Sequence, residues 1–149
     1  MVRHVCDFEE KSVFAVLALC ICSFGLYVIY RLWQLTHVIN PRVENPISRA
    51  FTATAICIHV LSLLGILCYF LFPAPPALLL TAKLLHLLSS LFHVVWIIKV
   101  RNRLNTINNN KKGDVLWLNA LLSSFFHVIY FQYKINQTVD SGRTKKLEA

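Results

Sequence analysis

The sequence predicts an all-α fold, a polytopic transmembrane helical bundle with four spanning helices. It contains four long apolar segments, and each is close to the ~20 residues that an α-helix needs to cross ~30 Å of hydrocarbon. All seven carboxylates of the chain lie outside these segments. The hydrophobic fraction of 56% also exceeds the usual share of a globular domain. The four predicted spans are residues 13–30, 50–72, 78–100 and 115–133.

The first predicted span, residues 13–30, follows a short stretch of mixed charge. No cleavage site of small residues precedes the next connection, so we expect a retained helix and not a signal peptide. That connection covers residues 31–49. It contains Pro41 and Pro46, which prevent a continuous helix.

The later connections are shorter and differ in polarity. A tight, uncharged turn at residues 73–76 joins the second span to the third. The connection at residues 99–114 is basic and contains three consecutive asparagines, 108–110, which predict a polar turn. We expect residues 1–140 to form a single transmembrane domain and residues 141–149 to be a disordered tail.

The net charge of +8 is placed beside helix ends, which favours contact with anionic lipid headgroups over nucleic-acid binding. The positive-inside rule assigns the connections 31–49 and 99–114 to the cytoplasm and therefore both termini to the outside. The basic residues of the tail, from Lys134 to Lys146, do not fit this topology, because they also favour the cytoplasm. The eight residues that set the predicted orientation are Arg31, Arg42, Arg49, Lys99, Arg101, Arg103, Lys111 and Lys112.

The chain carries a weak internal helix repeat. Residues 87–96 match residues 121–130 at seven of ten positions, including a shared Ser-Ser-x-Phe-His-Val core. Inverted repeats are typical of transporters, which bind substrate near the midplane. We interpret this single-helix repeat as duplication of a helix that packs well.

Polar residues inside apolar segments are costly, so each indicates a structural or functional role. On each of three predicted spans they recur at helical spacing, which predicts polar stripes that face inward and exchange interhelical hydrogen bonds. Lys83 lies near a helix end, where its ammonium group can reach the headgroups. The candidate intramembrane site comprises His59, His86, His93, His127, Lys83, Asn119, Ser90 and Ser123, with no catalytic or metal-ligating residue assigned.

The histidines leave several kinds of chemistry open. We favour neutral imidazoles that hydrogen-bond neighbouring helices, with no cofactor. His86 and His127 are predicted at similar depth, and paired histidines of this kind can ligate a haem iron. Metal binding and proton relay are further alternatives. The cysteines form no Cys-x-x-Cys pair, so a thiol oxidoreductase is disfavoured.

Three short stretches carry a resemblance to a known family. Residues 24–34 (FGLYVIYRLWQ), 46–51 (PISRAF) and 131–136 (FQYKIN) resemble an uncharacterised family of small bacterial multi-span membrane proteins, a domain of unknown function. The resemblance implies a bacterial inner (plasma) membrane and transfers no active site.

The chain length, the four spans and the basic connections are also similar to the microsomal glutathione transferase and leukotriene synthase family. That family carries an arginine-led Asn-x-x-Glu pattern on its second helix. Here Arg49 is followed by Ala-Phe-Thr-Ala-Thr-Ala-Ile-Cys57, which contains neither residue. A membrane enzyme of this class, or a haem-binding one, therefore stays a minor alternative.

The function that we expect is association within the bilayer, not catalysis. Four short helices bury little protein surface alone, and Ser, Thr and His stripes suit helix contacts. The expected partners are the lipid bilayer and either a second copy of the chain or another membrane protein. The alternative is a small pore or transporter lined by the same stripes.

Overall fold

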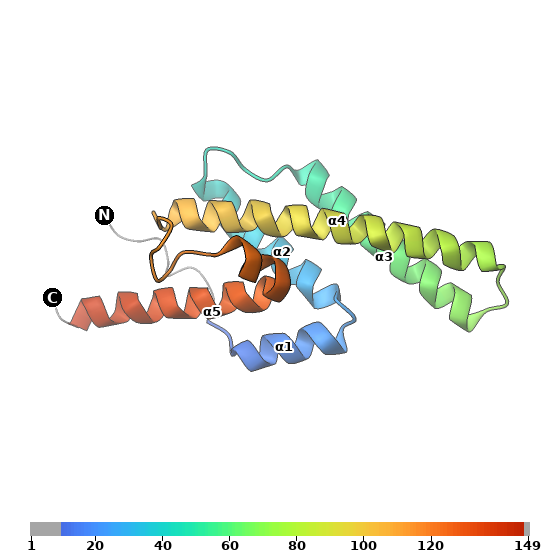
Figure 1. Ribbon diagram of the computed structural model, residues 1–149, viewed down its shortest axis with the longest axis horizontal. Coiled ribbons are helices and arrows are strands. Elements are labelled where there is room, and N and C mark those ends of the chain that lie inside the picture. Colours follow the sequence, from blue (N-terminus) through green and yellow to red (C-terminus); the bar gives the residue numbers. More distant parts are fainter. Residues whose placement is uncertain (1–9, 148–149) are drawn as a thin grey trace. The chain divides into compact units, whose positions relative to one another are not determined.

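The computed structural model describes residues 10–147, and the side chains of residues 10–140. Helix makes up 79% of it, and no strand occurs among the described residues, which confirms the all-α prediction. Figure 1 shows the helices in chain order. They are α1 (Val13–Cys22), α2 (Leu26–Ile39), the 3₁₀ helix η2 (Asn40–Arg42), α3 (Arg49–Leu71), α4 (Pro76–Ile107) and α5 (Ala120–Leu147).

The chain forms two compact units, which share the long helix α4. The first comprises Met1–Pro46 and Ile97–Ala149, and the second comprises Ile47–Trp96. The first unit therefore contains α1, α2, α5 and the end of α4. The second is a hairpin of α3 and the greater part of α4.

The hairpin turns at three prolines. Helix α3 ends where the N–H of Phe72 donates to the carbonyl of Cys68 at 3.0 Å. Pro76 is the first residue of α4, a position where the missing N–H costs nothing and the fixed φ suits a helix. The N–H of Leu78 donates to the carbonyl of Pro75 at 2.9 Å and closes the turn.

Inside the hairpin, small and polar residues line both helices at heptad-like spacing, as in closely packed antiparallel helices. A Cβ atom placed on Gly65 would lie 2.9 Å from the Cβ of Ala82, so the two helices approach closely there. At the other end the Phe51 ring stacks on Phe92, with ring centroids 5.6 Å apart. The spacing is four or three residues throughout: Thr52, Ala55, His59 and Ser62 on α3, and Ala82, His86, Ser89, His93 and Trp96 on α4.

In the first unit, α1 and α2 are separate because the backbone takes a left-handed conformation twice in succession. Phe24 has φ 50° and Gly25 has φ 87°, which no continuous α-helix accommodates. The Ser23 hydroxyl then accepts the N–H of Tyr27 at 2.9 Å, one of the donors left open at the start of α2.

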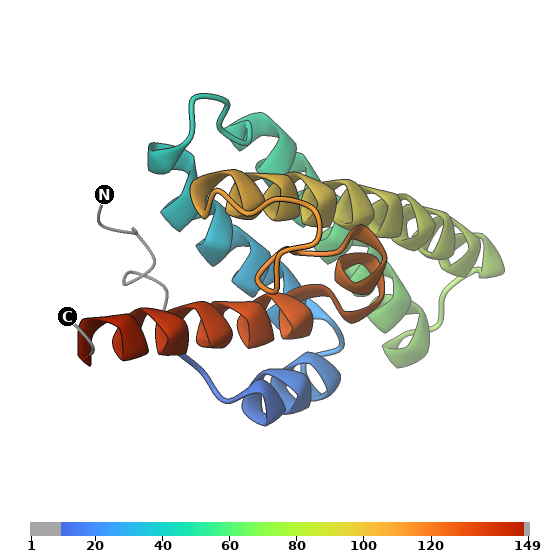
Figure 2. The same cartoon turned by 60° about the vertical axis from the view of Figure 1, so that its left-hand side comes forward.

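The core of this unit combines apolar residues of α2 and α5 with buried residues of α1 and of the end of α4. Helix α5 packs against both α1 and α2, as Figures 1 and 2 show. Burial of each large aliphatic or aromatic side chain contributes about 1.5–3 kcal/mol. The buried side chains include Leu32, Leu35 and Ile39 from α2 and Val128, Phe131 and Ile135 from α5.

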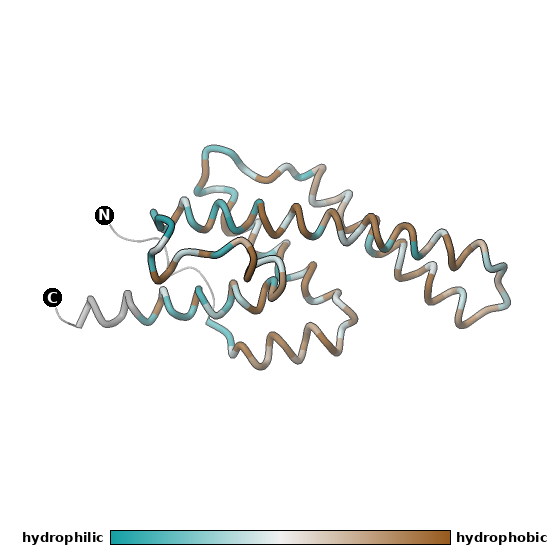
Figure 3. Tube along the Cα trace, viewed as in Figure 1, coloured by the Kyte–Doolittle hydropathy of each residue, from teal (hydrophilic) through white to brown (hydrophobic). Residues whose placement is uncertain are grey.

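Two of the four predicted spans are present as long apolar helices. The prediction of residues 50–72 matches α3, and that of residues 78–100 lies within α4, which continues to Ile107. Among the described residues, these two helices are long and apolar enough to cross a membrane. Only 17% and 11% of their apolar windows are buried within the protein, so most of their leucines are exposed and not packed in a core. Figure 3 shows hydrophobic residues predominating along both.

The other two predicted spans are interrupted, so four crossings are not confirmed. The segment 13–30 breaks after Cys22 and leaves α1 with 10 residues, about half a membrane crossing. The segment 115–133 is not helical before Ala120, and His127 leaves helical geometry at φ 46°, ψ −130°. Both breaks occur within apolar sequence, where hydropathy alone gives no sign of them.

The structure bears on two further expectations. Much of the predicted connection 31–49 is helical, because α2 continues to Ile39 and η2 follows directly. The predicted disordered tail, residues 141–149, is only partly covered. The backbone of residues 141–147 continues α5, and residues 148–149 lie outside the described part.

Candidate functional site

Three histidines meet inside the hairpin. The ring of His59 on α3 lies 5.6 Å from the ring of His86 and 4.9 Å from that of His93, measured between centroids. The side chain of His59 is 4% exposed. We call these three residues the histidine cluster. They are three of the four histidines in the site that the sequence predicts.

Two buried serines join the histidine cluster to both helices. The Ser89 hydroxyl on α4 lies 2.9 Å from Nδ1 of His59 on α3. The Ser62 hydroxyl on α3 donates to the His59 carbonyl at 2.8 Å and lies 3.2 Å from Nδ1 of His86. Since a serine has a single hydroxyl hydrogen, Ser62 accepts from His86 Nδ1–H, which assigns the tautomer of a neutral His86. Each helix thus supplies a serine to a histidine of the other.

One ring nitrogen of His59 stays outside these hydrogen bonds. Its Nε2 atom is buried and has no hydrogen-bond partner among the described residues. Among all residues that the structure describes, no group of three or more His, Cys, Asp or Glu side chains is placed to hold a metal ion. The arrangement can exchange hydrogen bonds and hold the two helices in register.

Lys83 and Ser90, also predicted for the site, lie on the exposed face of α4. The Ser90 hydroxyl donates to the His86 carbonyl of its own helix at 3.0 Å. Neither side chain takes part in the histidine cluster.

The polar residues predicted on the last span, Asn119, Ser123 and His127, lie at the start of α5 in the first compact unit. Asn119 and Ser123 make hydrogen bonds within that segment. The Asn119 side-chain oxygen accepts the N–H of Leu121 at 2.8 Å and caps the helix. The Ser123 hydroxyl donates to the Asn119 carbonyl at 2.7 Å. His127 lies at the break in α5. The suggested pairing of His86 with His127 on haem stays a prediction.

Ser62 and Ser89 were missing from the predicted site, although the sequence contains a signal for them. Both follow a histidine by three residues, in His59-x-x-Ser62 and His86-x-x-Ser89. Residues three apart share a helix face, so each motif places a ring and a hydroxyl side by side. The helical spacing from Lys83 had selected the neighbouring Ser90 instead.

A second buried polar group lies in the first unit, around Arg31. This residue was predicted to face lipid headgroups in a connection, but it lies within α2 and is 2% exposed. Its guanidinium donates to the side-chain oxygens of Gln34 and of Gln132 on α5. Gln132 in turn donates to Asn136 at 2.8 Å, and Asn136 donates to the Lys11 carbonyl at 2.9 Å.

Two other arginines predicted to face lipid headgroups donate hydrogen bonds to backbone carbonyls. Arg103 donates to the Asn45 carbonyl at 2.8 Å and to the Lys99 carbonyl at 3.0 Å. Arg42 donates to the Val38 carbonyl. The side chains of Arg49, Lys111 and Lys112 are exposed.

Lys134 lies on α5 beside the connection that precedes that helix. Its Nζ donates to the Val115 carbonyl at 2.5 Å and lies 5.8 Å from the ring centroids of Tyr130 and Tyr133. Partial burial lowers the pKa of this lysine, because it disfavours the charged form.

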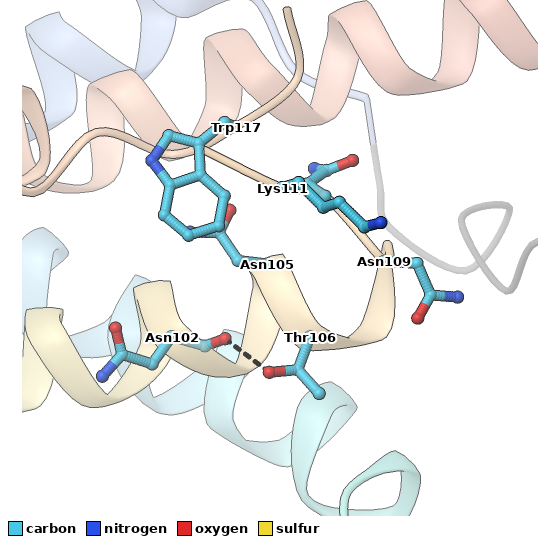
Figure 4. Close-up of a pocket in the computed structure, with 7 residues that line it drawn as sticks. Asn102, Asn105, Thr106, Asn109, Lys111 and Trp117 are labelled. Atoms are coloured by element: carbon cyan, nitrogen blue, oxygen red, sulfur yellow. Dashed lines mark hydrogen bonds between the residues drawn. The ribbon is translucent and has the colours of Figure 1, made fainter. Parts of the chain in front are cut away.

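A pocket of about 460 Å³ lies between the end of α4 and the following connection. Figure 4 shows the indole of Trp117 facing Asn105, with Asn109 and Lys111 at one end. We call it the asparagine pocket. Its lining residues are Asn102, Asn105, Thr106, Asn109, Asn110, Lys111 and Trp117.

Comparison with protein-family models, with curated proteins and with solved structures finds no match to this chain.

Proposed function

We propose that the protein is an integral membrane helical-bundle protein that acts by association, with a second copy of itself or with another membrane protein. The observation that carries the proposal is the exposed face of α3. Small residues and leucines recur there at intervals of four and three residues, the spacing of a helix–helix contact. This outer strip of α3 comprises Ala50, Thr54, Cys57, Leu61, Leu64, Cys68 and Leu71, all exposed.

Small residues favour helix association in a bilayer because they let two backbones approach closely. The exposed strip of α4 differs, since leucines predominate on it at similar spacing, including Leu80, Leu84, Leu87 and Leu91. Branched side chains of this size suit contact with lipid tails equally well. The contrast favours α3 over α4 as the helix that meets a partner.

The polar residues of the hairpin support association more than conduction. Ser62 and Ser89 are fully buried and hydrogen-bonded within the hairpin, so they do not line a surface that several copies could share as a pore. The outer strip of α3 contains no ionisable residue besides its cysteines. A pore or transporter, a haem protein and a glutathione-transferase-like enzyme therefore remain secondary proposals.

The cysteines of the outer strip offer a direct test. Cys57 and Cys68 are eleven positions apart, which returns to nearly the same side of a helix. A variant that keeps Cys57 alone is treated in membranes with a short bismaleimide. We expect a covalent dimer if two copies meet through this strip, and a heavier adduct with one other protein if the partner is different.

The matched control moves the single thiol to the outer face of α4, as Leu87→Cys in the cysteine-free chain. Leu87 is also exposed, at 62%, so both thiols are accessible to the reagent. Cross-linking that is equal at both positions, or absent at Cys57, contradicts association through α3. Extraction of the chain by alkaline carbonate would contradict membrane integration itself.

A further inference from the structure

We propose that the asparagine pocket binds the phosphate-bearing polyol headgroup of an anionic phospholipid. The inference rests on the proposed membrane location, and it adds a ligand and a site to it. The volume of about 460 Å³ lies within the ~300–1,000 Å³ of small-molecule sites.

The wall of the pocket is held rigidly by two of its asparagines. The side chain of Asn105 bonds Leu118 twice, accepting its N–H at 2.9 Å and donating to its carbonyl at 3.2 Å. The side chain of Asn110 donates to the Leu116 carbonyl at 2.8 Å. These bonds tie the connection that carries Trp117 to the end of α4, so the pocket is formed before a ligand arrives.

The end of α4 presents Asn109 through a Schellman motif. The N–H of Asn110 donates to the Asn105 carbonyl at 3.0 Å, and the N–H of Asn109 donates to the Thr106 carbonyl at 3.1 Å. Asn109 has φ 51°, the left-handed conformation that this motif requires and that asparagine tolerates better than most residues.

The side chains left available match a phosphorylated polyol. Among the described residues, the Asn109 amide and the Lys111 ammonium make no side-chain hydrogen bond, and both line the pocket. An amide both donates and accepts, as hydroxyl groups require, whereas the ammonium group supplies a positive charge for phosphate. The nearest carboxylate in sequence, Asp114, accepts the Lys111 backbone N–H at 2.6 Å and does not line the pocket.

The position along the chain favours a lipid as the source of this headgroup. The pocket follows directly on the second candidate span, whose last turns carry Lys99, Arg101 and Arg103. Trp117 lies in the connection that follows, and tryptophan is enriched at the level of the headgroups. Clusters of lysine and arginine beside the end of a membrane-spanning helix attract anionic headgroups.

The test uses the detergent-purified full chain, titrated with phosphatidylglycerol or phosphatidylcholine and followed by native mass spectrometry. We expect tighter retention of phosphatidylglycerol. Lys111→Glu should weaken that retention about tenfold, since it reverses a charge inside the pocket. Lys112→Glu is the matched control, because this neighbouring lysine is exposed but does not line the pocket.

Three outcomes would overturn the proposal. They are equal retention of both lipids by the parent chain, equal losses from Lys111→Glu and Lys112→Glu, and binding of free glycerol 3-phosphate as tight as that of the lipid. Equal losses from the two lysine variants would indicate diffuse charge attraction. Tight binding of free glycerol 3-phosphate would indicate a soluble ligand.

Asn109→Gly keeps the left-handed backbone and removes only the amide, so it should also weaken retention of the lipid. Carbonate extraction and Cys57 cross-linking are repeated on the Lys111→Glu variant. Because both should match the parent, failure of the pocket is distinguishable from failure of the proposed association.

Discussion

At the residue scale, the hairpin depends on hydrogen bonds that could not be assigned from sequence spacing alone. Adjacent serines on α4 have opposite environments, since Ser89 is fully buried against His59 and Ser90 is exposed. The predicted stripe selected Ser90, because that residue is in helical register with Lys83. Neighbouring positions on a helix point in different directions, so the orientation of α4 about its own axis determines which serine is buried. That orientation depends on the contacts of α4 with α3.

The two serines provide a prediction with its own control. Ser89→Ala removes the partner of His59 Nδ1 and should destabilise the hairpin by about 0.5–2 kcal/mol, the range of interhelical hydrogen bonds in membranes. Ser90→Ala should change stability by less than about 0.5 kcal/mol, as exposed substitutions do. Unfolding in mixed micelles, followed by circular dichroism, measures both. Equal effects of the two substitutions would refute the observed helix rotation.

The buried guanidinium of Arg31 gives a second prediction at this scale. Gln132→Leu keeps the size of the side chain but removes an acceptor, so we expect a loss of about 1.5–3 kcal/mol, as for hydrogen bonds to charged groups. Gln137→Leu is the control on the same helix, because the hydrogen bond that its amide donates to the hydroxyl of Tyr133 is exposed. If the two variants unfold at the same denaturant concentration, Arg31 does not depend on Gln132.

At the element scale, the closest approach in the hairpin is the contact of Gly65 with Ala82. A methyl group on Gly65 would lie 2.9 Å from the Ala82 methyl, which is too close for two carbon atoms. Gly65→Ala should therefore push the helices apart, although alanine favours a helix over glycine by ~1 kcal/mol. Adding Ala82→Gly removes the clash, and we expect a favourable coupling of about 1–2 kcal/mol between the two changes.

The control for this cycle pairs Gly65→Ala with Ala53→Gly. Ala53 is exposed on α3, so the second change has the same effect on helix propensity but lies away from α4. Unfolding in mixed micelles is measured for all single and double variants. Coupling as large with Ala53 as with Ala82 would show that propensity, and not contact, determines the result.

How far the sequence predicts the elements depends on what defines each of them. Helices α3 and α4 follow from long apolar runs, and the prolines between them mark the turn. The break at Phe24 and Gly25 and the one at His127 occur within apolar runs, because left-handed backbone geometry is not visible in hydropathy. The candidate site was predicted only in part, because the break at His127 and the start of α5 are not visible in hydropathy either. Three of its histidines are brought together, whereas Asn119 and Ser123 are used in starting α5.

At the scale of the whole molecule, the number of membrane crossings decides the side on which each terminus lies. The sequence predicts four crossings and places both termini outside, against the preference of the basic tail. In the part of the chain that the structure describes, two helices are suited to cross, and they form one hairpin. With two crossings, the chain before α3 and the chain after α4 emerge on the same side. In that case the positive-inside rule would place the tail and the basic connections together in the cytoplasm.

The two topologies differ at Ser12, which precedes α1 and is exposed. We expect Ser12→Cys and Lys112→Cys, each in a chain without its own cysteines, to resist a membrane-impermeant maleimide in intact cells and to react once the membrane is opened. Ala77→Cys, beside the hairpin turn, should react from outside and serves as the positive control. Four crossings would expose Ser12→Cys together with Ala77→Cys while Lys112→Cys stays protected. Ser12 therefore separates the topologies, because the other two positions label identically in both.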